Sequence, residues 1–135
     1  MSLRTAGAWL SLALLGAGLG GPALSADRED AQELDQYVRT GETKACLSAR
    51  SLRSARILNG HQILFEMHNG VRYLNEPRPC GGMRTTHAIS YTLTTSSLCS
   101  LTIIRLIDPS SPSWEQGACG LDEFQTLAPR AAATQ

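Results

Sequence analysis

The sequence lacks every short motif that commonly marks an enzyme active site. It contains no Gly-x-Ser-x-Gly elbow, no His-Glu-x-x-His motif, no glycine-rich phosphate loop and no Ser-x-x-Lys pair. Acidic residues are present, but they are too scattered to single out the two carboxylates that a glycoside hydrolase needs. The missing motifs favour a protein that binds rather than one that catalyses.

Aromatic residues and lysine are also scarce. Aromatic side chains make up 5% of the chain, and Lys44 is the single lysine beside eleven arginines. Proteins that bind single-stranded nucleic acid combine a basic groove with interleaved aromatic side chains on which bases stack. Because the chain has no formal net charge and its arginine-rich stretch lacks such aromatics, we expect no nucleic-acid partner.

Closely spaced metal ligands are missing as well. Zinc ligands usually occur as close pairs, whereas the four cysteines lie 34, 19 and 20 residues apart. His61 and His68 each flank an Asn-Gly dipeptide, and His87 precedes an expected strand, so none of them needs a functional explanation. We predict no metal site and no cofactor.

Charge is absent from residues 5–26, and this gap marks the N-terminal segment. Arg4 precedes an apolar centre, and small residues follow before a block of charge begins. This order is typical of a signal peptide, with cleavage near residues 25–26. An uncleaved membrane anchor is the alternative, but the glycines and the proline in this run weaken a spanning helix. We predict a signal peptide over 1–26 and a periplasmic or secreted chain without membrane contact after cleavage.

An even number of cysteines in an exported chain predicts disulfides. The cysteines are Cys46, Cys80, Cys99 and Cys119. We favour the pairs Cys80–Cys99 and Cys46–Cys119, because the first would hold an irregular crossing and the second would join the first and last strands of a closed barrel. The pairs Cys46–Cys99 and Cys80–Cys119 are the alternative.

Acidic residues precede basic ones along the mature chain. Residues 27–43 hold six acids and two bases, and residues 44–84 hold seven bases and two acids. Apolar residues of the acidic segment recur at helical spacing, at positions Ala31, Leu34, Tyr37 and Val38. We predict a short acidic helix or arm over 27–43. This arm either folds back onto the basic half or leaves it for an anionic partner.

Two Asn-Gly dipeptides divide the next segment into strands. Asn-Gly is the favoured pair of two-residue hairpin turns, and apolar and polar residues alternate around both copies. We predict a meander with strands near 53–58, 61–68 and 71–75.

The remainder of the chain favours further short strands. Residues 76–86 contain proline and glycine and cannot form a central strand, so we predict a crossing there. A second hairpin is predicted over 87–108, a loop over 109–118 and a last strand over 119–127.

These elements predict a mainly β domain over residues 44–127. Short strands separated by turns at about ten-residue spacing are typical of a small antiparallel barrel or sandwich. We expect about six strands and one short N-terminal helix, stapled by two disulfides. Residues 128–135 are predicted to be a disordered tail.

The ordered segments CLSARSLRSARIL, ILFEMHNGVRYLN, PCGGMR, LCSLTIIRLID and CGLDEF extend across residues 44–125. As a set, they resemble an uncharacterised family of small exported proteobacterial proteins, a four-cysteine β domain of unknown function. Gly81 stands where that family often has proline after its second cysteine. The resemblance implies export and a stapled β domain, and it implies no activity.

Four residues are candidate partner contacts. Arg50, Arg53 and Arg56 recur every third residue, and their guanidinium groups suit phosphate or carboxylate groups of an anionic envelope component or a protein. A solvated strand edge is the alternative explanation. Trp114, the one tryptophan after the cleavage site, is either a partner contact or a lid over the barrel end.

The leading hypothesis is therefore a non-enzymatic exported β domain that binds an envelope component or a protein partner. The alternative is a hydrolase, or a hydrolase inhibitor, that acts on cell-wall material. A deep cleft with converging polar groups would favour the enzyme, and a shallow basic or aromatic face would favour the binding domain.

Overall fold

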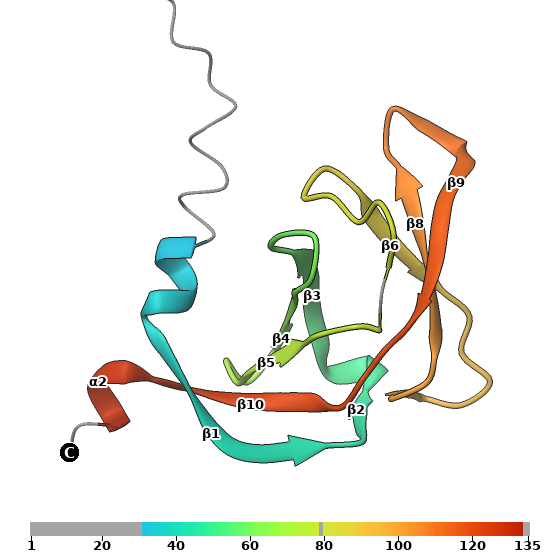
Figure 1. Cartoon of the computed structure of the whole chain (residues 1–135). Helices are drawn as coiled ribbons and strands as arrows, with labels where there is room; N and C mark the ends of the chain where they lie inside the picture. The colour runs from blue at the N-terminus through green and yellow to red at the C-terminus, as the bar shows by residue number, and fades with distance from the viewer. Residues whose placement is uncertain (1–30, 79, 134–135) are drawn as a thin grey trace, which may run out of the picture.

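The computed structural model of the chain describes residues 31–78 and 80–133 (Figure 1). The predicted signal peptide and the first residues of the acidic arm lie outside the described residues, as do the side chains of residues 112–114. The described residues form mainly antiparallel β-structure, which confirms the predicted fold class.

The strands form three sheets. The five-stranded sheet has the order β1-β10-β5-β4-β3, the three-stranded sheet has the order β6-β8-β9, and β2 pairs with β7. The bounds in the first sheet are β1 (Tyr37–Lys44), β3 (Leu52–Ile57), β4 (Ile63–Met67), β5 (Arg72–Asn75) and β10 (Phe124–Pro129). The others are β2 (Cys46–Ser48), β6 (Ala88–Tyr91), β7 (Ser97–Cys99), β8 (Ile103–Asp108) and β9 (Ser111–Gly120), with short helices η1 (Ala49–Ser51) and α2 (Arg130–Ala133).

The two larger sheets lie at opposite ends of the molecule, and β9 leads directly into β10 from one to the other (Figure 1). The hydrogen-bonded sheets do not close on themselves, because β3 and β6 are edge strands of separate sheets. The described residues therefore form ten strands in open sheets, where the sequence predicted about six in a barrel or sandwich.

The main core lies between the sheets and receives side chains from all three. Phe65 of β4 and Phe124 of β10 are fully buried at its centre, and their rings meet edge to face with centroids 5.2 Å apart. Leu98 of β7 and Ile104 of β8 are equally buried. Removal of this apolar surface from water is the main driving force that stabilises the fold.

A smaller apolar cluster lies apart from the main core. Its buried members are Leu58, Leu64, Leu74 and Leu127. Leu34 and Tyr37, from the N-terminal arm, pack against this cluster. The arm thus covers a part of the five-stranded sheet that would otherwise expose leucines to solvent.

The meander of β3, β4 and β5 confirms the three predicted strands. Its turns differ from the prediction, because each loop has three residues rather than two. The Leu58 N–H donates to Gln62 O and the Met67 N–H donates to Val71 O, both over 2.9 Å. The side chains of Asn59 and Asn69 each accept a bond from a backbone N–H two residues later, which stabilises the longer loops.

Only the second of these loops needs a glycine. Gly70 has a φ of +85°, whereas the φ of Gly60 is not positive. A residue with a Cβ loses about 1 to 2 kcal/mol in the left-handed region. We therefore expect Gly70→Ala to lower the free energy of unfolding by about 1 kcal/mol, measured by urea denaturation.

Gly60→Ala is the matched control for this prediction. A Cβ at position 60 would lie 3.7 Å from Met83 O, which is an ordinary contact. We expect little change in stability from this variant. Equal losses from both substitutions would contradict the assignment of the left-handed turn to Gly70.

The predicted acidic helix over 27–43 is wrong in its second half. Residues 31–35 are helical, but Tyr37–Lys44 form β1, which pairs with β10. Tyr37 and Val38 suit a strand as well as a helix, and pairing with the C-terminal strand decides between the two. The apolar spacing of the segment did not reveal this distant partner.

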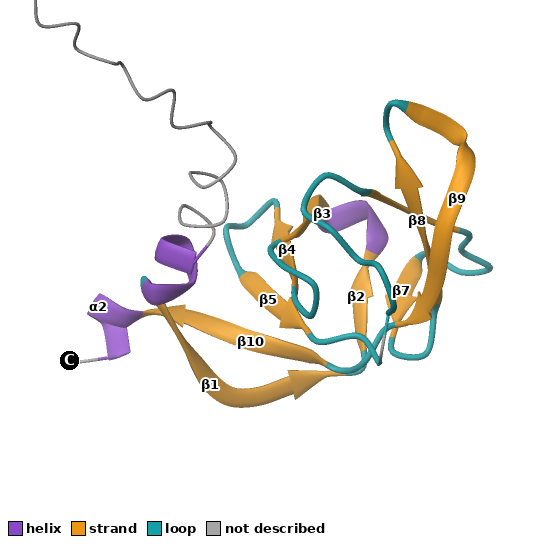
Figure 2. Cartoon of the chain, turned by 45° about the horizontal axis from the view of Figure 1, so that its top comes forward, coloured by secondary structure: helices purple, strands orange, loops and turns teal. Residues whose placement is uncertain are grey.

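The predicted disordered tail is wrong for residues 128–133. The strand β10 continues to Pro129, and α2 follows it. The Arg130 N–H donates to Gln36 O over 2.7 Å, and Arg130 Nε donates to Asp35 O over 2.7 Å. Figure 2 shows the helical residues 31–35 beside α2, so the two ends of the domain support each other.

The predicted second hairpin and the loop after it also differ. β6 pairs with β8, but residues 97–99 between them leave the hairpin and pair with β2. The predicted loop over 109–118 lies largely in β9, which pairs with β8 through two irregularities in register. The proline and serine residues suggested a loop, and β9 accommodates them because it is an edge strand.

The disulfides are Cys46–Cys99 and Cys80–Cys119, so the favoured pairing is wrong and the alternative is confirmed. Cys46 and Cys99 are directly opposite each other in the β2–β7 pair. The favoured pairing assumed that a closed barrel joins its first and last strands. The sheets remain open, so this assumption fails.

One buried polar side chain holds the segment between β9 and β10 in place. Asn75 is fully buried, its amide donates to Asp122 O over 2.6 Å, and its carbonyl accepts from the Asp122 N–H over 3.0 Å. Removal of the amide would leave two backbone groups without these bonds. We expect Asn75→Ala to lower the free energy of unfolding by about 2 to 3 kcal/mol.

Asn69→Ala is the control for this effect, because Asn69 is exposed and its side chain satisfies one backbone N–H. We expect a loss below about 1 kcal/mol for the control. Denaturant titrations of the two variants measure the difference. Similar losses would mean that burial of the amide contributes nothing.

Candidate functional site

The three candidate arginines do not form one free basic patch. Arg50 lies in η1, and Arg53 and Arg56 lie in β3. Arg53 Nη1 is 3.4 Å from a Glu66 carboxylate oxygen, and Arg56 forms an ion pair with Glu33 of the N-terminal arm. The acidic arm thus folds back onto this part of the basic segment.

Further charged side chains continue this network across the five-stranded sheet. Arg72 lies 3.3 Å from Glu66, and its guanidinium carbon is 5.0 Å from the centre of the Tyr37 ring. A hydrogen bond from the Gln62 amide is the main cause that lowers the pKa of Glu76, and the Arg39 guanidinium, 2.7 Å away, adds to it. These contacts hold the arm in place, although exposed pairs of this kind contribute little stability individually.

Trp114 lies in β9 rather than in a loop. Its side chain is outside the described part of the structure, so its predicted role as a partner contact or a lid stays a prediction. The four sequence-predicted residues are divided between two sheets and η1.

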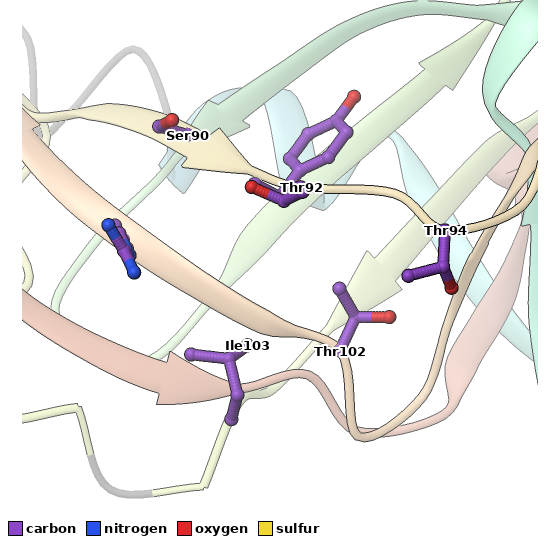
Figure 3. Close-up of a pocket in the computed structure, with 7 residues that line it drawn as sticks. Ser90, Thr92, Thr94, Thr102 and Ile103 are labelled. Atoms are coloured by element: carbon purple, nitrogen blue, oxygen red, sulfur yellow. The ribbon is translucent and has the colours of Figure 1, made fainter.

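A surface hollow elsewhere in the structure is a better candidate for a binding site. A hollow of about 370 Å³ lies over β6, β8 and the segments next to them (Figure 3). Its lining residues are Ser90, Tyr91, Thr92, Thr94, Thr102, Ile103 and Arg105. In Figure 3, Ser90, Thr92 and Thr94 follow one side of the hollow, and Thr102 and Ile103 follow the other.

Strand register explains why these side chains are accessible. Along residues 88–94, even-numbered positions are exposed, whereas Ile89 and Tyr91 pack against the main core. Ser90 is opposite Arg105, and Tyr91 is opposite Ile104. Because successive side chains of a strand point to opposite faces, Ser90 and Arg105 share the outer face of this sheet.

Two small residues of the third strand leave the adjacent side chains of β8 uncovered. Gly120 of β9 is opposite Ile103, and Ala118 is opposite Arg105. Such small neighbours cannot hide the longer side chains of β8. Ile103 remains 58% exposed, and Arg105 reaches only one described carboxylate, that of Glu115 at 3.7 Å.

The lining of the hollow has donors and acceptors but no general acid or base for neutral pH. Its described lining residues supply hydroxyls, the Tyr91 ring, one guanidinium and an aliphatic side chain, without carboxylate, imidazole or thiol groups. Hydroxyl and guanidinium groups are typical of recognition, whereas proton transfer near pH 7 needs a group whose pKa lies near that value.

A serine, a histidine and an aspartate occur close together near the end of β8, but their hydrogen bonds do not match a hydrolytic triad. The Ser110 hydroxyl donates to Asp108 Oδ1 over 2.7 Å and is the main cause of the lowered pKa of Asp108, to which His87 adds a smaller effect. In a triad the serine hydroxyl donates to the histidine instead. Among the described residues, no group of three His, Cys, Asp or Glu side chains is placed to hold a metal ion.

Comparison with known proteins found no matching family model, no matching curated protein and no matching solved structure. The resemblance to exported proteobacterial proteins thus stays a prediction. In the described part of the chain, none of the helices has the length and apolar character needed to span a bilayer.

The sequence interpretation missed the residues of this outer face. Two patterns point to it in retrospect. Ser90, Thr92 and Thr94 alternate with apolar residues, and residues 77–107 contain three arginines without a single Asp or Glu. Neither pattern identifies an exposed site unless the strand neighbours are known.

Proposed function

We propose that the mature chain is a non-enzymatic exported domain that binds an envelope component or a partner protein. The binding surface is the outer face of the sheet formed by β6, β8 and β9, which we call the outer β6–β8–β9 face. The observation that carries the proposal is the hollow on this face, whose described lining offers hydroxyls, the Tyr91 ring, a guanidinium and Ile103 but no carboxylate or imidazole.

Two features of the chain support export. The N-terminal segment has the pattern of a signal peptide. Four cysteines form two disulfides in the structure, and disulfides persist in oxidising compartments such as the periplasm or the extracellular space. A periplasmic or secreted location is therefore part of the proposal.

The proposal is tested by photo-crosslinking in the cell of origin. A photoreactive amino acid replaces Thr92 on the outer β6–β8–β9 face, and a second variant carries it at Thr43, an exposed position of β1. We expect adducts of defined mass from position 92 and none from position 43. Equal labelling from both positions would reject the outer β6–β8–β9 face as the binding surface.

The hydrolase alternative needs a separate assay. Purified mature chain is incubated with isolated cell-wall material, and soluble fragments are measured by chromatography. We expect no release above the buffer control. Release that is lost after Ser90→Ala or Arg105→Ala would replace the binding proposal with an enzymatic one.

A further inference from the structure

We infer that Leu101 and Ile103 are the apolar anchors through which the outer β6–β8–β9 face binds a partner protein that presents aliphatic side chains beside carboxylates. This inference rests on the proposed binding function and narrows its ligand to a protein. Leu101 and Ile103 are the two large hydrophobic side chains that the described part of the structure leaves exposed, at 69% and 58%.

Leu101 occupies a costly backbone conformation. Its φ of 70° makes it the one non-glycine residue with a positive φ among those described. The left-handed region disfavours residues with a Cβ atom, because this atom comes too close to the following carbonyl oxygen, and glycine would relieve the strain. Strained residues that persist on a surface often serve function. Leucine at this position gives the fold no compensating burial.

The turn that carries Leu101 is firmly attached to its neighbours. The Thr102 N–H donates to Cys99 O over 3.1 Å, the Leu101 N–H donates to Leu121 O over 2.8 Å, and the Leu121 N–H donates to Thr102 O over 3.0 Å. Cys99 is linked to Cys46. Leu101 is therefore presented from a fixed backbone, which lowers the conformational entropy lost when a partner binds.

Ile103 begins β8, two residues after Leu101 in the turn that precedes this strand, and it lines the hollow. Its neighbour in β9 is Gly120, whose missing side chain leaves Ile103 open to contact. Exposed aliphatic side chains can anchor in an apolar pocket of another protein, and well-packed contacts near the centre of an interface carry much of its binding energy.

The charge of this part of the chain favours a partner that carries carboxylates. Residues 77–107 form the crossing, β6, β7 and most of β8, and they contain arginines but no acidic residue. The Arg105 side chain is 63% exposed, and its contact with Glu115 is long and open to solvent. A carboxylate of the partner can therefore approach Arg105 and form a shorter charge-assisted hydrogen bond.

The test selects peptides from a phage-displayed random library on the purified mature chain. We expect the selected peptides to be enriched in Asp and Glu next to Leu, Ile or Met. A synthetic copy of one selected peptide is then titrated by calorimetry against four variants. We expect Ile103→Ser, Leu101→Gly and Arg105→Glu each to weaken binding about tenfold, while Arg50→Glu, the charge control on η1, leaves binding unchanged.

Two further measurements separate a contact role from a structural one. Leu101→Gly should show an unchanged or higher urea midpoint, because glycine accepts the positive φ. A copy of the peptide with lysine in place of its acids should bind Arg105→Glu more tightly than it binds the wild-type chain. A lower midpoint for Leu101→Gly, in parallel with its loss of binding, would assign Leu101 a structural role.

The inference fails if no peptide is selected above background, or if the selected peptides bind Leu101→Gly and Ile103→Ser as tightly as the wild-type chain. Crosslinks from position 92 together with such a result would leave the proposed binding function standing and identify another ligand. A glycan adduct at position 92 would have the same meaning.

Discussion

Phe65→Ala is expected to lower the free energy of unfolding by about 3 to 5 kcal/mol, among the largest effects of any single substitution in this chain. The chain has two phenylalanines, and both meet at the centre of the main core. Phe65 is fully buried, it lies opposite Ala55 of β3 and Tyr73 of β5, and its ring meets that of Phe124 of β10. Its removal leaves a cavity that the neighbouring strands cannot collapse to fill.

Denaturant titration at neutral pH measures this loss, with Ile103→Ala as the control. Ile103 is more than half exposed, so its truncation should change stability by less than about 0.5 kcal/mol.

The contact between the two rings is tested by the variants Phe65→Leu and Phe124→Leu and by the double variant. We expect a coupling energy of about 0.5 to 1.5 kcal/mol for the edge-to-face contact. Strict additivity would show that the two rings contribute only through burial.

The meander was predictable because its information is local. Alternating residues, and an asparagine followed by glycine at each turn, lie within about twenty residues of one another, and the three strands pair in sequence order. Even there, the turn type escaped prediction. The asparagine side chains bond to His61 and Val71, and these bonds favour loops one residue longer than the dipeptide suggests.

The remaining strands were harder to predict because their partners are distant. Tyr37 and Val38 become strand residues only through pairing with residues 128 and 129, nearly the full length of the domain away. The three-residue strands β2 and β7 are too short to show periodicity, and they owe their pairing to Leu47, Leu98 and a disulfide. Local patterns carry no information about such contacts.

The candidate site was missed for a related reason. The sequence shows that Ile103 and Arg105 alternate with Ile104 and Leu106 along one strand. It does not show that Gly120 and Ala118 lie beside Ile103 and Arg105. Exposure depends on those neighbours across the sheet. The arginines that the sequence did single out were less informative, because the arm supplies Glu33 to Arg56 and β4 supplies Glu66 to Arg53.

The second large effect is expected from removal of the Cys80–Cys119 disulfide. In the double variant Cys80→Ala, Cys119→Ala, the unfolded chain regains the freedom of a closed loop with a sequence separation of 39 residues. The chain-entropy relation gives a loss of about 4 kcal/mol for a loop of this size. The crossing between β5 and β6 relies on this link, together with buried Met83 and a bond from the Arg78 N–H to Gly120 O.

Removal of Cys46–Cys99, whose sequence separation is 53, provides the comparison. The entropy relation predicts a similar loss of about 4 kcal/mol. The part of the folded chain that becomes more mobile should differ between the two variants. Backbone pairing of β2 with β7 and the buried Leu47 and Leu98 remain after this link is lost. We expect hydrogen exchange to accelerate over the crossing in the first variant and to stay slow there in the second.

Peptide mapping without reduction verifies the pairing on which both expectations depend. Trypsin should leave Cys46 in residues 45–50 and Cys99 in residues 85–105, linked to each other. The peptide that ends at Arg84 should be linked to the one that carries Cys119. Partial reduction should open Cys46–Cys99 first, since Cys46 is exposed whereas Cys119 is 6% exposed, and exposure admits the attacking thiolate. A peptide that joins Cys80 to Cys99 would overturn this connectivity, and with it the attachment of the crossing to β9.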